Sequence, residues 1–266
     1  MAFSSQLYRD EVIINDETPE EMYMPQAPDQ GRGLALEMRG FGDYVYGSFA
    51  APFPQELLIP RSEWQARIQE MEEQKSRISD LINLKKLPHK DQGSTNYCWI
   101  NAPVHCLEIN RLQQNQKVVT LSPASAGAPI KNFSSVGGWG LEAVKWLAKN
   151  GCCPVDQWPA NAIERKYYTE ANRQLALKYR VDEWIECRPR NVEQMISLLL
   201  RRFPGAGGYN WWRHEITNCD PIWLDGEVAV RIRNSWRGWG QFGFGVLQGS
   251  KMLADDLVFL QNSLAA

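Results

Sequence analysis

Residues 92–99 read Gln-Gly-Ser-Thr-Asn-Tyr-Cys-Trp, and the character of the chain changes at this stretch. Just before it, Pro88 belongs to a linker-like break. From Cys98 to about Gln114 an apolar run predicts a helix, in which Pro103 lies in an early turn or bends the axis. Ten of the 11 tryptophans and all six cysteines lie beyond residue 97. The stretch therefore separates two regions of different composition.

Helical periodicity appears on both sides of this break. Residues 62–84 place apolar side chains on one face, and Ser62 with Gln65 fits a capping box at the start of that helix. A second capping pattern begins at Asn191, and Gly151 is expected to end an earlier helix. The predicted helices cover residues 62–84, 98–114, 141–150, 161–178 and 191–204.

The region after Pro204 changes to strand patterns. Asp225-Gly226 is a strong hairpin turn between two predicted strands, Ile216 to Leu224 and Glu227 to Arg233. Residues 242–247 predict one more strand. Helices followed by antiparallel strands indicate an α+β fold.

Charge divides the chain as well. Residues 1–30 carry a net charge of −6 in a chain whose total is −2. We therefore predict three parts: an irregular acidic arm over 1–61, an amphipathic helix over 62–87, and the main domain over 88–266. The helix either packs on the core or belongs to a pro-segment.

Composition excludes several classes of protein. The small negative net charge argues against nucleic acid as a partner, and no apolar run is long enough to cross a membrane. The first residues do not resemble a secretion signal, so a cytoplasmic location is expected. Without a secretion signal the six cysteines do not predict a disulfide framework, and without a C-x-x-C pair their spacing does not predict a metal site.

The predicted hairpin brings two polar residues together. His214 and Asn234 lie near the same end of the two strands, and Asn234 follows the alternation of the apolar residues Val230 and Ile232. We expect Asn234 to reach His214 from the buried side and to fix its ring by a hydrogen bond.

Cys98 is the candidate nucleophile, because a thiolate at a helix start is stabilised by the helix dipole and by a neighbouring imidazolium. Of the three histidines, His105 lies about 10 Å further along the same predicted helix. His89 lies in the linker without an evident orienting partner. By elimination, His214 is the expected base.

Four segments resemble those of papain-like cysteine peptidases, and they occur in that family's order. The resemblance spans about residues 88–250. It implies a two-lobed α+β fold, with a helical half that carries the cysteine and an antiparallel β half that carries the histidine and asparagine. The four segments are Gln92–Trp99, Gly137-Gly138-Trp139-Gly140, Trp212–Ile216 and Asn234–Gly240.

The resemblance implies four catalytic roles. Cys98 would attack a carbonyl carbon, and His214 would form an ion pair with it and protonate the leaving group. Asn234 would orient His214. Gln92 would supply a side-chain donor to the oxyanion.

The resemblance also implies a substrate-binding set. Gly137 and Gly138 would pair with the backbone of an extended peptide. Trp236 would shield the histidine–asparagine bond from water. Asn96, beside the nucleophile, replaces a small residue of the family and would reshape the site.

The expected function is hydrolysis of peptide or protein substrates by a divergent intracellular or phage-type member of the family, without a metal or cofactor. Arg213 and Glu215 flank His214 where the family usually differs, and an adjacent arginine would lower the imidazolium pKa. Two alternatives therefore stay open. One is a silent structural or interaction protein of a larger assembly such as a virion, and the other is a cysteine-dependent acyltransferase.

Overall fold

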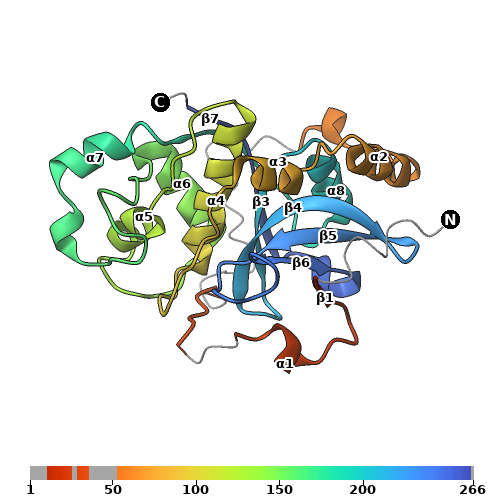
Figure 1. The fold of residues 1–266 in the computed structure, drawn as a ribbon, viewed down its shortest axis with the longest axis horizontal. Helices are drawn as coiled ribbons and strands as arrows, with labels where there is room; N and C mark the ends of the chain where they lie inside the picture. The colour runs from red at the N-terminus through yellow and green to blue at the C-terminus, as the bar shows by residue number, and fades with distance from the viewer. Residues whose placement is uncertain (1–10, 26–28, 36–52, 265–266) are drawn as a thin grey trace.

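The computed structural model describes residues 11–25, 29–35 and 53–264, and a seven-stranded sheet connects their parts (Figure 1). The strand order is β1-β6-β5-β4-β3-β7-β2, antiparallel except for the β1–β6 pair. The strands are β1 (Val12–Ile14), β2 (Val181–Glu186), β3 (Gly205–Tyr209), β4 (His214–Leu224), β5 (Glu227–Arg233), β6 (Phe244–Leu247) and β7 (Asp256–Ser263).

Helices lie on both sides of this sheet. The α-helices are α1 (Glu20–Tyr23), α2 (Arg61–Glu73), α3 (Ile78–Lys85), α4 (Cys98–Gln113), α5 (Pro123–Ile130), α6 (Gly140–Asn150), α7 (Glu170–Ala176) and α8 (Val192–Leu200). Short 3-10 turns are η1 (Gln55–Leu57), η2 (Arg165–Tyr167) and η3 (Gly249–Met252). Among the described residues, no helix is long and apolar enough to cross a membrane.

The core has two main clusters, which correspond to the two halves of the fold. One cluster joins α4, α5 and α6 to β3 and β7, and the helices of this half gather to the left of the strands in Figure 1. The other joins α2 and α8 to β4 and β5 together with a group of tryptophans. This arrangement confirms the two-lobed α+β fold.

The predicted starts and ends of several helices are confirmed. Cys98 is the first residue of α4, and Pro103 lies inside this helix. The Asn191 side chain accepts a hydrogen bond from the backbone N–H of Gln194 at the start of α8, at 2.9 Å. Gly151 follows α6 with a φ of +73°, a conformation that glycine adopts without strain.

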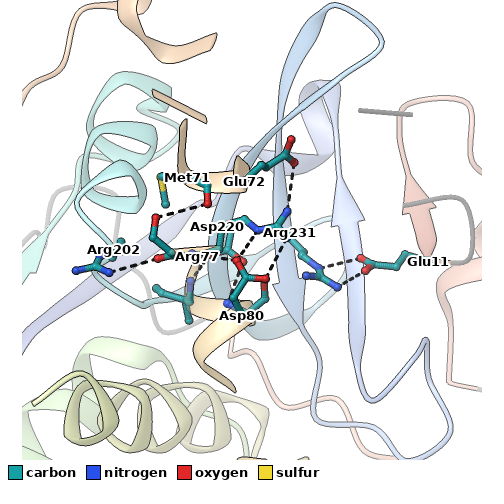
Figure 2. Close-up of polar contacts among 11 residues, drawn as sticks. Glu11, Met71, Glu72, Arg77, Asp80, Arg202, Asp220 and Arg231 are labelled. Carbon is teal, nitrogen blue, oxygen red and sulfur yellow. Dashed lines mark hydrogen bonds and ion pairs between the residues drawn. The ribbon is translucent and has the colours of Figure 1, made fainter. Parts of the chain in front are cut away.

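The predicted helix over 62–84 is wrong as one element, because it is broken into α2 and α3. Lys75 has a φ of +49° at the break. The Ser62 capping box is also wrong, because α2 begins directly after Pro60 without a side-chain cap. The start of α3 is instead capped from β4, where the carboxylate of Asp220 accepts from the N–H of Ile78 at 2.7 Å (Figure 2). Within the first turn of α3 the Asp80 carboxylate also accepts from the N–H of Arg77, at 3.1 Å, whereas the contact with the distant Asp220 leaves no local signal.

Other elements were missed for a related reason. β3 reads Gly-Ala-Gly-Gly-Tyr, which has low intrinsic strand preference, yet it pairs with both β4 and β7. Strands β2 and β7 and helix α5 were not predicted either, and 161–178 contains only η2 and α7.

The N-terminal arm contains regular structure that was not expected. β1 extends the sheet beside β6, and Ile14 is completely buried. Glu11 forms an ion pair with Arg231 of β5, which Figure 2 shows beside Asp220. The three predicted parts stay predictions, and residues 36–52 of the arm lie outside the described residues.

The β4–β5 hairpin turns at Asp225-Gly226 as predicted. Its pairing then shifts between Asn218 and Asp220, so that Cys219 forms a bulge. A one-residue shift exchanges the faces of all residues beyond it. The His214 end of β4 therefore presents its side chains on the opposite faces from those that unbroken pairing from the turn would give.

Candidate active site

The His214 and Asn234 side chains meet at the end of the hairpin. Nε2 of His214 lies 2.7 Å from Oδ1 of Asn234, and both residues are buried. The ring of Trp236 stacks on the imidazole, with centroids 4.1 Å apart. Nδ1 of His214 makes no hydrogen bond to a described residue. The asparagine thus fixes the ring through one nitrogen and leaves the other for a reacting group.

His89 supports this pair from the linker, a role that the sequence did not suggest. Its Nε2 lies 2.8 Å from the carbonyl oxygen of Asn234. The backbone N–H of Asn234 donates to the carbonyl of Gly243 at 2.8 Å. Asn234 is therefore held on both sides of its backbone.

Cys98 lies at the N-terminus of α4 and is completely buried. The backbone N–H of Gly33 donates to its sulfur at 3.2 Å. The next residue, Trp99, lies under Gly138, where a Cβ would come within 2.5 Å of its ring. Only glycine fits at position 138. Because Gly138 has no side chain, another peptide backbone can approach its N–H and carbonyl groups closely.

Gln92 is held in place by Ser235, the residue after Asn234. The Ser235 hydroxyl donates to Oε1 of Gln92 at 2.7 Å. This bond leaves the amide Nε2 as the donor, and it donates to the carbonyls of Gly31 at 2.8 Å and Thr95 at 2.9 Å. Ser235 was not singled out in the sequence, although it belongs to the Asn-Ser-Trp segment.

Residues 29–35, here called the strap, cross this group of side chains. The N–H of Gly138 donates to the carbonyl of Gly33 at 2.9 Å, and the N–H of Ala35 donates to the carbonyl of Gly138 at 3.0 Å. Leu34 thereby forms a parallel bridge with Gly138. The Nε1 of Trp236 also donates to the carbonyl of Gly31, at 3.1 Å.

Glycines let the strap lie this close. A Cβ on Gly33 would come within 1.8 Å of the carbonyl oxygen of Asn96, and one on Gly31 within 2.3 Å of that of Thr95. The Asn96 side chain points to another loop and donates to the carbonyl of Ser135 at 2.9 Å. A Cβ on Gly137 would also approach the Gly33 carbonyl, at 2.5 Å. The strap and the wall beside Cys98 therefore fit backbone against backbone.

Burial sets the protonation states in this closed arrangement. It raises the pKa of the Cys98 thiol to about 12, and the nearby charge of Glu215 raises it further. Burial lowers the pKa of His214 to about 3, against the Asn234 hydrogen bond, and Arg32 of the strap lowers it as well. Both groups are thus neutral near pH 7, and the predicted ion pair does not form while the strap is in place. The arginine that acts on His214 is Arg32, and not the adjacent Arg213.

The buried neutral histidine predicts acid sensitivity. The unfolded chain gains a proton on His214 near pH 6.5, whereas the folded chain gains it only near pH 3. Stability is therefore full above pH 6.5 and falls as the pH decreases toward 3. The parent is expected to lose free energy of unfolding between pH 7.5 and pH 5. In His214→Gln we expect this loss to be smaller by about 2 kcal/mol. Urea unfolding at both pH values measures this, and identical losses in the two proteins would contradict it.

The other cysteines lie apart from this site. All six are free and buried. Cys152, for example, donates to the carbonyl of Ser122 at 3.1 Å within the helical half. In the described ranges no three His, Cys, Asp or Glu side chains are grouped to hold a metal ion.

The chain is similar in sequence to two cathepsins of Paramecium tetraurelia. Cathepsin L 1 is 24% identical over 237 residues, which cover 82% of this chain and 74% of the relative. Cathepsin L 2 is 25% identical over 227 residues, which cover 78% and 71%. No protein-family model matches the chain.

Solved structures share the fold at lower identity. Procathepsin L 3 from the larval midgut of Tenebrio molitor aligns with a TM-score of 0.59 and 15% identity, over 86% of this chain and 76% of the other. Xylellain, a cysteine protease from Xylella fastidiosa, aligns with a TM-score of 0.53 and 18% identity, over 66% and 82%. The fold and the sequence similarity agree with the four segments that carry Cys98, Gly138, His214 and Asn234. The chain thus has the fold of papain-like cysteine proteases, and its sequence is similar to the cathepsins of this class.

Proposed function

We propose that this chain is a cysteine peptidase whose active site is closed by its own strap, residues 29–35. The observation that carries the proposal is that an extended peptide segment already lies on the site. Its backbone pairs with Gly138, and its Gly31 carbonyl accepts from the amide of Gln92. A site that binds a peptide backbone and a carbonyl oxygen beside an oriented histidine suits peptide-bond hydrolysis.

The chemistry follows once the strap is displaced. Solvent access lowers the pKa of Cys98 and raises that of His214, because burial is the main cause of both shifts. The proton moves from the sulfur to the imidazole, and the thiolate attacks the substrate carbonyl carbon. Gln92 and the Cys98 N–H stabilise the oxyanion. His214 then protonates the leaving amine, and water hydrolyses the thioester.

The strap itself is protected from this reaction by what it presents to the nucleophile. The strap group that contacts the Cys98 sulfur is the N–H of Gly33, which cannot be attacked as a carbonyl carbon can. The carbonyl of Gly31, which Gln92 binds, is two residues away along the strap. The strap therefore occupies the site as an inhibitor rather than as a substrate.

The test is hydrolysis of an unfolded protein such as carboxymethylated casein. A full-length Gly33→Ala variant, in which the strap no longer fits, is expected to cleave it, and Gly33→Ala with Cys98→Ala is expected not to. Equal cleavage by both variants would show that the activity is not that of Cys98. Transfer of the cleaved acyl group to an added amine in preference to water would favour an acyltransferase.

A silent structural protein is the second candidate, and the complete burial of Cys98 favours it. Under this alternative the strap is a permanent part of the fold. Gly33→Ala would then lower stability without producing any cleavage.

A further inference from the structure

A pocket of about 500 Å³ opens between η1, α2 and the end of α8, away from the active site. Three arginines line it, and within the described ranges no acidic residue belongs to the lining. A hollow that combines positive charge with apolar walls suits a ligand that carries both carboxylates and an apolar group. This cavity is called the arginine pocket. Its apolar walls are Leu57, Ile59, Leu200 and Phe203.

Two of the arginines are exposed and hold no carboxylate. In the part of the chain that the structure describes, neither Arg201 nor Arg202 forms an ion pair. The Nε and Nη2 of Arg201 donate to the carbonyls of Leu57 at 3.1 Å and Glu56 at 2.9 Å, which leaves Nη1 as a donor. Arg202, which Figure 2 shows, donates to the carbonyl of Ser76 at 3.4 Å. Two adjacent guanidiniums are thus available to bind a pair of negative charges.

The same chain exposes the complementary chemistry on α1. Glu20 and Glu21 are both exposed, and neither forms an ion pair with another described residue. Met22, the next residue, is 59% exposed and is one of few large apolar side chains exposed in the described ranges. Two carboxylates beside a flexible apolar side chain match two guanidiniums beside an apolar hollow.

The short helix α1 is held in a fixed position by the residue that follows Met22. Tyr23 is buried and packs edge-to-face on Trp211, with ring centroids 5.2 Å apart. The Nε1 of Trp239 donates to the carbonyl of Tyr23 at 3.3 Å. Because α1 is already ordered, a partner that binds it has little conformational entropy to remove.

A molecule cannot place its own α1 in its own arginine pocket. Arg202 precedes β3, whereas Trp211, which contacts Tyr23 of α1, follows this strand. The five residues of β3 span about 17 Å. Figure 1 accordingly shows α1 at the lower edge of the view and α2 and α8 at the upper right. The two complementary surfaces can meet only between two molecules.

We propose that α1 of one copy of this chain docks in the arginine pocket of a second copy. Glu20 and Glu21 pair with the two exposed arginines, and Met22 enters the apolar part of the pocket. The contact joins two different surfaces, so the copies associate head to tail and form a ring or an open chain. This association is independent of the chemistry at Cys98, so either proposal can fail alone.

Light scattering of the full-length protein over a concentration series measures the association. Up to about 300 μM, which covers micromolar dissociation constants, the average mass is expected to rise to at least about twice that of the monomer. In about 0.5 M NaCl the association is expected to weaken, because exposed ion pairs are screened. A parent that stays monomeric over the whole series would overturn the proposal.

Exchange of charges tests which surfaces meet. Glu20→Arg with Glu21→Arg reverses the charge of α1, and Arg201→Glu with Arg202→Glu reverses that of the pocket. Each double variant alone is expected to associate at least about tenfold more weakly than the parent, because like charges then face each other. A mixture of the two variants is expected to associate like the parent, since each surface again meets its opposite charge.

Asp182→Arg with Glu183→Arg reverses two adjacent exposed carboxylates of β2 and is the matched control, which should associate like the parent. Parent-like association of either test variant would overturn the proposal, and so would a mixture of the two that stays monomeric. The altered side chains are all exposed, and circular dichroism checks that each variant folds. If the arginine variant does not fold, the α1 variant and Met22→Asp, which is also expected to abolish association, still decide.

Discussion

Gly33→Ala is expected to raise the rate at which iodoacetamide alkylates Cys98 by about 100-fold at pH 7. The added Cβ would lie 1.8 Å from the carbonyl oxygen of Asn96 and 2.4 Å from its carbonyl carbon. Both atoms are backbone, so they cannot move aside as a side-chain end would. A clash of this kind costs about 3 kcal/mol, which corresponds to about a 100-fold change in the open population. In the parent, complete burial and a pKa of about 12 keep the thiol unreactive.

Mass spectrometry of each cysteine after a timed reaction measures this effect. The remaining five buried cysteines act as internal references, and they should stay slow in both proteins. Asp29→Ala, which changes an exposed side chain of the same strap, is the matched control and should react like the parent. Equal alkylation rates in parent and Gly33→Ala would refute the strap as the cover of the site.

Asp220→Ala is expected to lower the free energy of unfolding by about 3–5 kcal/mol. The carboxylate is completely buried and accepts from the N–H groups of Ile78 at 2.7 Å and Ser79 at 3.2 Å. Arg77 and Arg231 interact with it electrostatically. Its loss would leave two backbone N–H donors of α3 without their acceptor. It would also remove one negative charge that stabilises Arg77 and Arg231.

Urea unfolding followed by tryptophan fluorescence gives the measurement. Asp182→Ala, an exposed aspartate in β2, is the control and should change stability by less than about 0.5 kcal/mol. An Asp220→Ala protein as stable as this control would show that the cap and the ion pairs in Figure 2 do not hold α3 to the sheet.

Local patterns were sufficient for much of the fold. A capping asparagine at Asn191, a terminating Gly151 and a turn at Asp225-Gly226 act over a few residues, so each could be predicted without knowledge of the rest of the chain. The order of the four matched segments extended this to the two-lobed architecture. By contrast, the start of α3 depends on Asp220, which lies more than 140 positions away.

The strap could not be predicted, for the same reason. Nothing around Gly31 and Gly33 resembles a binding motif, and their glycines read as ordinary loop residues. Their importance follows only from the backbone of Thr95 and Asn96 on the opposite side of the site. His89 likewise becomes meaningful only through its contact with the carbonyl of Asn234.

The sequence by itself determined which residues are available for the chemistry: a cysteine at a helix start, few histidines, and an asparagine at the end of a hairpin. Whether two of them meet was decided by tertiary structure. If β4 and β5 paired without interruption from the Asp225-Gly226 turn, His214 and Asn234 would lie on opposite faces of the sheet. The bulge at Cys219 shifts the pairing by one residue and brings them to the same face. The strap then decided their protonation, because burial stabilises the neutral forms of Cys98 and His214. Both effects arise from contacts between distant parts of the chain, which no local pattern encodes.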